Sequence, residues 1–236
     1  HRGTKLAEGN GKKAYAFKCP YHSWVYNLNG ELTGRPRENA FDQIKKNECS
    51  LKRITLHNHQ GFLWLVFNKK AEQRYKSNIE HLNKLLKNYD LNKHHHYKSY
   101  KIYPKLNWKL AVDTFLEFYH IDHLHPKSLA PILKSDMCLF DSYGQNIRMI
   151  GPRHSAVKLN RTLKNENEFD IHTLKNNLLF PSTMVICHPE HTEVWHILPK
   201  DEVNTCEVSY SLYAREPFNT ESAIRHWENN FQLTIK

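Results

Sequence analysis

The chain has 236 residues, of which 39% are apolar and 12% aromatic. This composition excludes a disordered chain, and the length is typical of one large or two small globular domains. The 34 basic residues exceed the 24 acidic ones by ten. Because the basic residues are scattered and no nucleic-acid motif accompanies them, we expect a solvated basic surface or an acidic protein partner, and no nucleic acid.

The apolar pattern contains no run of the roughly 18 residues that would span a membrane. The longest apolar run is 61–67, which is aromatic and β-branched and is predicted to form a buried strand. Residues 1–16 are polar and basic, unlike a secretory signal peptide. The five cysteines are odd in number and irregularly spaced, which does not fit a disulfide framework. We therefore expect a reducing, cytoplasmic setting and no membrane association.

The first part of the chain, residues 1–68, is predicted to be a small β domain. Short strands are expected within it at 14–17, 24–26 and 61–67. A connector follows at 69–96, and its apolar residues at helical spacing predict a short amphipathic helix: Ile79, Leu82, Leu85 and Leu86. The histidine run 94–96 is interpreted as a solvated loop and not as a metal-binding tract.

The remaining residues, 97–236, are predicted to form an α+β domain. A long periodic helix is expected from Asn107 to His125. A final helix should begin after a cap at Asn219 or Thr220 and run toward Lys236. Strands are expected between these helices, at 146–154, 178–188, 192–199 and 206–214.

The motif Cys19-Pro-Tyr-His22, followed by Ser-Trp and an Asn-Gly turn, can direct two ligands at one metal centre from a tight loop. C-x-x-H alone is also compatible with half of a zinc site. The wider string resembles the second ligand box of Rieske proteins, and His1-Arg2-Gly3 resembles the end of their first box. The resemblance implies that His1, Cys19 and His22 bind a [2Fe–2S] cluster. The first cluster cysteine would lie two places before His1, outside this sequence. Cluster irons held by histidine have a raised reduction potential.

The segment 107–126 resembles the iron-binding helix of Rieske non-haem iron oxygenase alpha subunits, with the pattern N-W-K, an acidic residue, Y-H and a second histidine. On a helix, Glu117 and His120 share one side. Pro126 disfavours α conformation at His125, which places His125 at the helix end. The resemblance assigns His120 and His125 as ligands of a mononuclear Fe(II), and gives Glu117 a bridging role toward the cluster histidines of a neighbouring subunit.

Other polar residues near this segment receive smaller roles. Tyr119 is expected to support the site by hydrogen bonding, and His123 to be a surface or outer histidine. The third iron ligand is expected to be an aspartate beyond the end of this sequence. Four acidic residues are interpreted as turn or surface groups and not as that ligand: Asp201, Glu202, Glu221 and Glu228.

The resemblance covers nearly the whole chain and implies a fragment of such an alpha subunit, lacking both ends. It implies an all-β Rieske domain followed by a helix-grip (START-like) catalytic domain, in a homotrimer or with a beta subunit. Electrons would come from NAD(P)H through a reductase or ferredoxin, and O2 would be used to hydroxylate an aromatic ring or demethylate a small substrate. Candidate pocket walls are Phe115, Phe180, Met184 and Trp195, although each is also compatible with simple core packing.

Three alternatives remain open at this stage. An aromatic cage would suit a betaine- or carnitine-like quaternary amine through cation–π attraction. A Rieske electron carrier without oxygenase activity is a second alternative, which the segment 107–126 disfavours because a carrier needs no second iron. A non-catalytic paralogue is the third.

Overall fold

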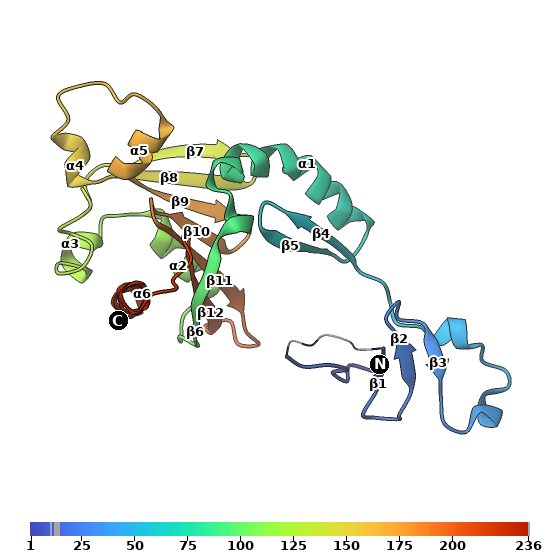
Figure 1. The fold of residues 1–236 in the computed structure, drawn as a ribbon. Coiled ribbons are helices and arrows are strands. Elements are labelled where there is room, and N and C mark those ends of the chain that lie inside the picture. Colours follow the sequence, from blue (N-terminus) through green and yellow to red (C-terminus); the bar gives the residue numbers. More distant parts are fainter. Residues whose placement is uncertain (10, 12–14, 236) are drawn as a thin grey trace. The chain divides into compact units, whose positions relative to one another are not determined.

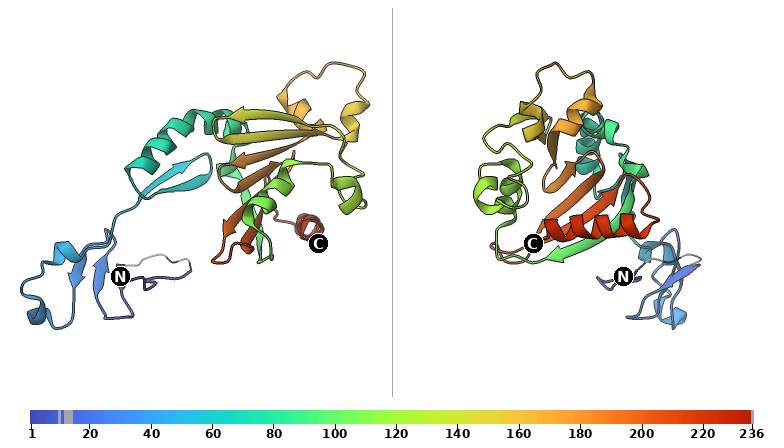
Figure 2. Two further views of the ribbon diagram at one scale, coloured as in Figure 1. Left: turned by 180° about the vertical axis from the view of Figure 1, so that it is seen from behind. Right: turned by 60° about the vertical axis from the view of Figure 1, so that its left-hand side comes forward.

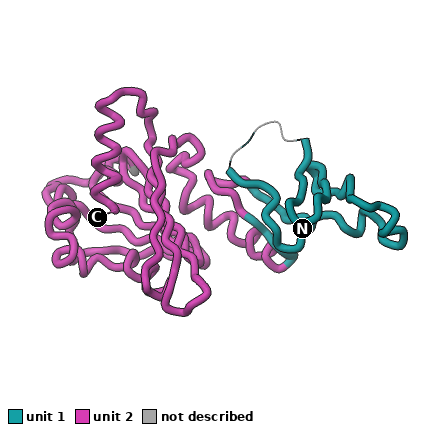
Figure 3. Tube along the Cα trace, turned by 90° about the horizontal axis from the view of Figure 1, so that it is seen from below, with its two compact units in different colours: residues 1–57, 65–69 teal, residues 58–64, 70–236 magenta. Residues whose placement is uncertain are grey.

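The computed structural model describes residues 1–9, 11 and 15–235. The chain divides into two compact units, shown in different colours in Figure 3. The N-terminal unit comprises 1–57 and 65–69, and the C-terminal unit comprises 58–64 and 70–236. None of the described helices is long and apolar enough to cross a membrane.

The N-terminal unit contains a small antiparallel sheet of three strands in the order β1-β2-β3. These strands are Ala16–Lys18, Val25–Asn27 and Leu32–Gly34. Two 3₁₀ turns follow, at Glu38–Phe41 and Lys46–Cys49. The core is small, consisting of three fully or nearly fully buried side chains: Cys19, Tyr26 and Leu32. Of the predicted strand 14–17, Ala14 lies outside the described residues.

A hairpin of β4 (Thr55–His59) and β5 (Phe62–Val66) comes next in the chain, and α1 (Lys69–Leu86) follows it. The predicted amphipathic helix is confirmed, although it is longer than the connector pattern suggested. Two 3₁₀ turns, Lys87–Tyr89 and Leu91–Lys93, lead into the main sheet. His95 and His96 belong to the first strand of that sheet, so the expected loop at 94–96 is wrong.

The C-terminal unit is built on an antiparallel sheet of seven strands, in the order β6-β12-β11-β10-β9-β8-β7 (Figure 1). From β7 to β12 each strand pairs antiparallel with the next strand along the chain, while β6 pairs with the last strand. The strands, in chain order from β6, are His95–Ile102, Leu139–Tyr143, Asn146–Pro152, Thr173–Leu179, Thr183–Cys187, His191–Pro199 and Cys206–Ala214. The single strand expected at 178–188 is therefore two strands joined by a tight turn.

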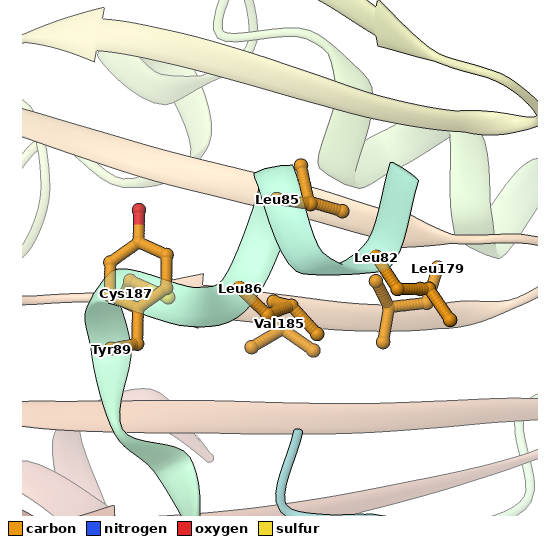
Figure 4. Packing of buried hydrophobic residues seen from close by; sticks show 7 residues of the cluster. All are labelled: Leu82, Leu85, Leu86, Tyr89, Leu179, Val185 and Cys187. Atoms are coloured by element: carbon orange, nitrogen blue, oxygen red, sulfur yellow. The ribbon is translucent and has the colours of Figure 1, made fainter. Parts of the chain in front are cut away.

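Helices cover both faces of this sheet (Figure 2). On one face, α1 packs Leu82, Leu85 and Leu86 against β9 and β10 (Figure 4). The other face carries α2 (Trp108–Asp113), α3 (Ile121–Leu124) and α6 (Glu221–Thr234). Two short helices, α4 (His154–Val157) and α5 (Glu166–His172), lie between β8 and β9 in the chain. The Thr220 side chain caps α6 by accepting from the Ala223 backbone N–H at 3.2 Å, which confirms the predicted start.

Strand alternation decides which residues reach each face, because successive side chains of a strand point to opposite sides. Val185 and Cys187 of β10 pack with α1, whereas Met184 packs with α2. The pairing register places Met184, Trp195 and Tyr210 in one row across β10, β11 and β12. Trp195 and Tyr210 pack with α6, so this row belongs to the face that carries the predicted iron segment.

Candidate metal centres

The loop from Cys19 to Trp24 brings two predicted cluster ligands together in the N-terminal unit. The Cys19 backbone N–H donates to the Trp24 carbonyl at 2.8 Å, and the Ser23 N–H donates to the Cys19 carbonyl at 2.9 Å. The Cys19 side chain is fully buried within this turn. Across it, His1 stacks on Trp24, with ring centroids 4.5 Å apart, and meets the edge of the His22 ring at 5.9 Å.

The chemistry of this loop fits a cluster bound through His1, Cys19 and His22. The Nδ1 atom of His1 is buried and has no hydrogen-bond partner among the described residues. A buried ring nitrogen without a partner costs free energy, and metal ligation would remove that cost. All five cysteines are free thiols, as the sequence predicted, so Cys19 is available as a ligand.

The predicted iron segment is not one long helix. The Asn107 side chain caps α2 by accepting from the Lys109 backbone N–H at 2.9 Å, and a 3₁₀ turn, Thr114–Leu116, continues it. Glu117 then adopts extended backbone, with φ −147° and ψ 156°, before the single turn of α3. The expectation of a continuous helix from Asn107 to His125 is therefore wrong.

Glu117 nevertheless contacts His120, although the two residues do not share one side of a helix as predicted. Its carboxylate accepts a hydrogen bond from the His120 backbone N–H at 3.2 Å and also contacts the Nδ1 atom of the His120 ring. Partial burial raises the pKa of the Glu117 carboxyl, but these contacts with His120 outweigh it and lower the pKa below its usual value. A carboxylate on Nδ1 fixes the ring tautomer, because Nδ1 carries the proton and Nε2 keeps its lone pair for a ligand.

His125 lies beside His120, at the end of α3. Its backbone N–H donates to the Ile121 carbonyl at 2.9 Å, and Pro126 follows directly. The centroids of the two histidine rings are 5.5 Å apart. Burial and the neighbouring His120 lower the pKa of His125, which favours the neutral imidazole that binds metals. This pair fits two positions of a mononuclear iron site.

The pair opens into a cavity of about 260 Å³ between α3 and the sheet. Its walls are mostly apolar and include Phe115, Phe118, Ile186 and Trp195. Two of the four candidate pocket residues, Phe115 and Trp195, therefore line it. The other two do not, because Phe180 is half exposed and Met184 is fully buried in the core.

No carboxylate among the described residues completes a compact three-ligand group with the histidine pair. The Glu228 carboxylate instead accepts from the Tyr97 hydroxyl at 2.8 Å and from Lys98 Nζ at 3.0 Å. The expected support from Tyr119 is absent from the described contacts, because that side chain is 82% exposed. His123 is exposed, as expected.

Sequence reasoning missed a second group of polar residues on the cavity wall. Asn176 donates to the Phe115 carbonyl at 2.9 Å, and Glu193 accepts from Trp195 Nε1 at 3.1 Å. His188 lines the cavity beside them. The only sequence signal was the His-Pro-Glu-His-Thr-Glu run at 188–193. The side chains of this run come together only because β10 and β11 form a hairpin.

Comparison with known proteins identifies both parts of the chain. Residues 1–54 match the Rieske [2Fe-2S] domain, and residues 90–235 match the ring hydroxylating alpha subunit (catalytic domain). The chain belongs to the ring-hydroxylating alpha subunit family. The sequence-based recognition, the α+β fold class and the presence of a Rieske domain are thereby confirmed.

Two curated relatives and two solved structures illustrate the similarity. The carnitine monooxygenase oxygenase subunit of Acinetobacter baumannii is 28% identical over 132 residues, covering 53% of this chain and 34% of the relative. The glycine betaine monooxygenase oxygenase subunit of Pseudomonas aeruginosa is 30% identical over 138 residues, covering 58% of this chain and 31% of the relative. The matches therefore span about a third of these relatives.

The solved structures agree in fold. A quaternary ammonium Rieske monooxygenase in complex with L-carnitine superposes with a TM-score of 0.74 at 21% identity, covering all of this chain and 63% of the other. Naphthalene 1,2-dioxygenase with bound indole superposes with a TM-score of 0.66 at 20% identity, covering 96% of this chain and 58% of the other.

Proposed function

We propose that this protein is the catalytic subunit of a Rieske-type oxygenase, which uses O2 and electrons from a partner to oxidise a small organic substrate. The observation that carries the proposal is the Glu117-oriented pair His120 and His125, which opens into an apolar cavity. A Rieske electron carrier would need neither a second metal site nor a substrate cavity. The Rieske domain match on the same chain supplies the electron-accepting part.

The proposal gives each site residue one role. His1, Cys19 and His22 would hold the [2Fe–2S] cluster, and His120 and His125 would hold the mononuclear iron. When bound, these groups supply electron transfer and oxygen activation. The apolar walls of the cavity exclude water and orient the substrate.

Glu117 has a second proposed role, as the bridge to the cluster ligands of a neighbouring subunit. Its side chain is 44% exposed although both carboxylate oxygens contact His120. Because each carboxylate oxygen has two lone pairs, Glu117 can still accept a further hydrogen bond from outside. This role requires an oligomer, and we propose a homotrimer, with or without a beta subunit. A reductase or ferredoxin would deliver electrons from NAD(P)H in the cytoplasm.

The substrate class we propose is a small quaternary ammonium compound. The relatives named for carnitine and glycine betaine support this class. The cavity also presents the rings of Phe115 and Trp195, whose centroids are 5.1 Å apart, and aromatic faces attract cations. An aromatic substrate is the second candidate, supported by the apolar cavity walls and by the fold shared with naphthalene 1,2-dioxygenase.

Metal analysis of anaerobically purified full-length protein tests the oxygenase proposal. We expect about three iron atoms for every two acid-labile sulfides, that is, one cluster plus one separate iron. Zinc at Cys19 and His22 would refute it. With a reductase supplied, substrate-dependent O2 uptake with carnitine or betaine but not with naphthalene would support the quaternary ammonium class. The reverse preference would select the aromatic one.

A further inference from the structure

The β10–β11 hairpin brings together three metal-ligating side chains outside the proposed iron pair: His188, His191 and Glu193. One ligand atom from each lies within 4.8 Å of the other two. His188 directly follows β10, while His191 and Glu193 are the first and third residues of β11. Two residues apart on a strand, His191 and Glu193 point to the same face, and the tight turn returns His188 beside them.

The spacing of these atoms suits a bound ion better than direct hydrogen bonds. The Nε2 atoms of His188 and His191 each lie 3.6 Å from the same carboxylate oxygen, Oε1 of Glu193. That distance is too long for a hydrogen bond. Two ligand atoms on one tetrahedral ion, each about 2.0–2.1 Å from it, are separated by roughly 3.3–3.4 Å. A contraction of a few tenths of an ångström, together with rotation of one imidazole ring, would therefore bring the three ligand atoms onto one ion.

One contact orients the carboxylate, whereas the two imidazole rings stack with centroids 4.1 Å apart and planes 9° from parallel. Because an imidazole lone pair lies in the plane of its ring, one of the two rings must turn out of this stack before both can bind one ion. Trp195 Nε1 donates to Oε2 of Glu193 at 3.1 Å, which turns Oε1 toward the histidines. Such a hydrogen bond to a ligating carboxylate orients it and contributes to metal affinity.

The charges also match a cation. The Glu193 carboxylate supplies an anionic oxygen that faces the Nε2 atoms of His188 and His191. Among the described residues, no lysine or arginine forms an ion pair with Glu193. Arg153 lies on the opposite side of the His188 ring, 3.5 Å from Nδ1. The group therefore combines one carboxylate with two imidazoles, and the positive charge of Arg153 lies beyond the His188 ring on the side away from Glu193.

The group is also accessible. A cavity of about 290 Å³ is lined by all three side chains and also by Glu190 and His226. His188 and Glu193 additionally reach the wall of the cavity that holds His120 and His125. An ion could therefore enter without unfolding of the hairpin.

We propose that His188, His191 and Glu193 form a second site for a divalent transition-metal ion such as Zn²⁺, separate from the iron pair. Imidazole and carboxylate donors suit Zn²⁺, Co²⁺, Ni²⁺ and Fe²⁺. The site does not depend on the proposed oxygenase activity. An organic cation is a weaker fit, because a quaternary nitrogen is shielded by its methyl groups and makes no use of imidazole lone pairs.

Co²⁺ titration of full-length protein, with its cluster and iron already loaded, tests this site. We expect one additional Co²⁺ per chain, with visible absorption bands of a tetrahedral ion and a higher melting temperature. Glu193→Gln and His191→Gln should each lower the Co²⁺ affinity at least tenfold. The matched control is His196→Gln, on the same strand but hydrogen-bonded to Thr183 Oγ1 at 3.0 Å and outside the group. This control should bind Co²⁺ like the parent.

Several results would overturn the proposal. One is the absence of an additional Co²⁺ in protein whose iron content stays constant during the titration. A second is equal Co²⁺ affinity in the parent and in His191→Gln, which remains informative if Glu193→Gln does not fold. A third is a parent protein that binds tetramethylammonium but no Co²⁺, together with a Glu193→Gln variant that no longer binds tetramethylammonium. That result would assign the carboxylate to an organic cation.

Discussion

Gly151 of β8 leaves room for the Phe118 ring, and its replacement by alanine tests how the predicted iron segment is positioned. A Cβ atom at this position would lie 1.7 Å from Cε2 of Phe118 and 2.7 Å from both Cδ2 and Cζ. Carbon atoms in contact are about 3.5–4.0 Å apart, so the ring would have to move by about 2 Å. Phe118 directly follows Glu117 and lies two residues before His120, so this movement should disturb the histidine pair.

The expected loss of stability follows from two opposing effects. Forcing an extra methyl group into a packed core costs about 1–3 kcal/mol. Replacing glycine by alanine in a strand otherwise contributes about 0.5–1 kcal/mol in favour of the folded state. The free energy of unfolding of Gly151→Ala should therefore fall by up to roughly 2.5 kcal/mol. For a chain of this size the melting temperature should drop by up to roughly 10 °C.

Urea unfolding followed by tryptophan fluorescence, together with iron analysis, measures both consequences. Gly34→Ala is the control, because its Cβ would lie 3.9 Å from Val25 Cβ, an ordinary contact. Adding Phe118→Leu to Gly151→Ala should recover part of the iron content by relieving the clash. The reasoning is wrong if Gly151→Ala unfolds like the Gly34→Ala control and binds a full complement of iron.

Two further predictions concern charge and protonation. Glu117→Gln should leave both metal centres loaded but nearly abolish turnover, because the bridge from His120 is lost; reoxidation of a pre-reduced cluster at the parent rate in single-turnover assays would contradict this. Burial and the charge of Arg215 lower the pKa of His94, so the unfolded chain binds the proton more readily. The free energy of unfolding should therefore fall as the pH drops below about 6.5, the ordinary histidine pKa. His94→Asn should reduce this fall in urea titrations, whereas the exposed control His95→Asn should not; equal pH dependence of the two variants would argue against it.

The sequence by itself determined the features that depend on neighbouring residues. The leucines of α1 recur at helical spacing, and their burial against the sheet followed from that pattern. Thr220 predicted the start of α6 because a hydroxyl cap needs only the backbone three residues ahead. Likewise, the spacing from Cys19 to His22 is that of a single tight loop, and His125 ends its helix because proline follows.

Only the tertiary structure decided where the predicted iron segment, 107–126, breaks. The pattern of 107–125 is periodic enough for one helix, yet Phe115 and Phe118 pack into the core with Glu117 extended between them. The free energy gained by burying the two rings exceeds the small free energy by which a few residues would favour a continued helix. The Glu117 carboxylate then satisfies the His120 backbone N–H that the break leaves free.

The convergence of His188, His191 and Glu193 was only weakly indicated by the sequence, through the run at 188–193. It depends on the register of β10 with β11, which pairs Cys187 with Thr192 and thereby sets the length of the turn between them. A shift of one residue would send the β11 side chains to the opposite face. The short turn between β10 and β11 and the packing of the sheet against α2 and α6 together hold that register.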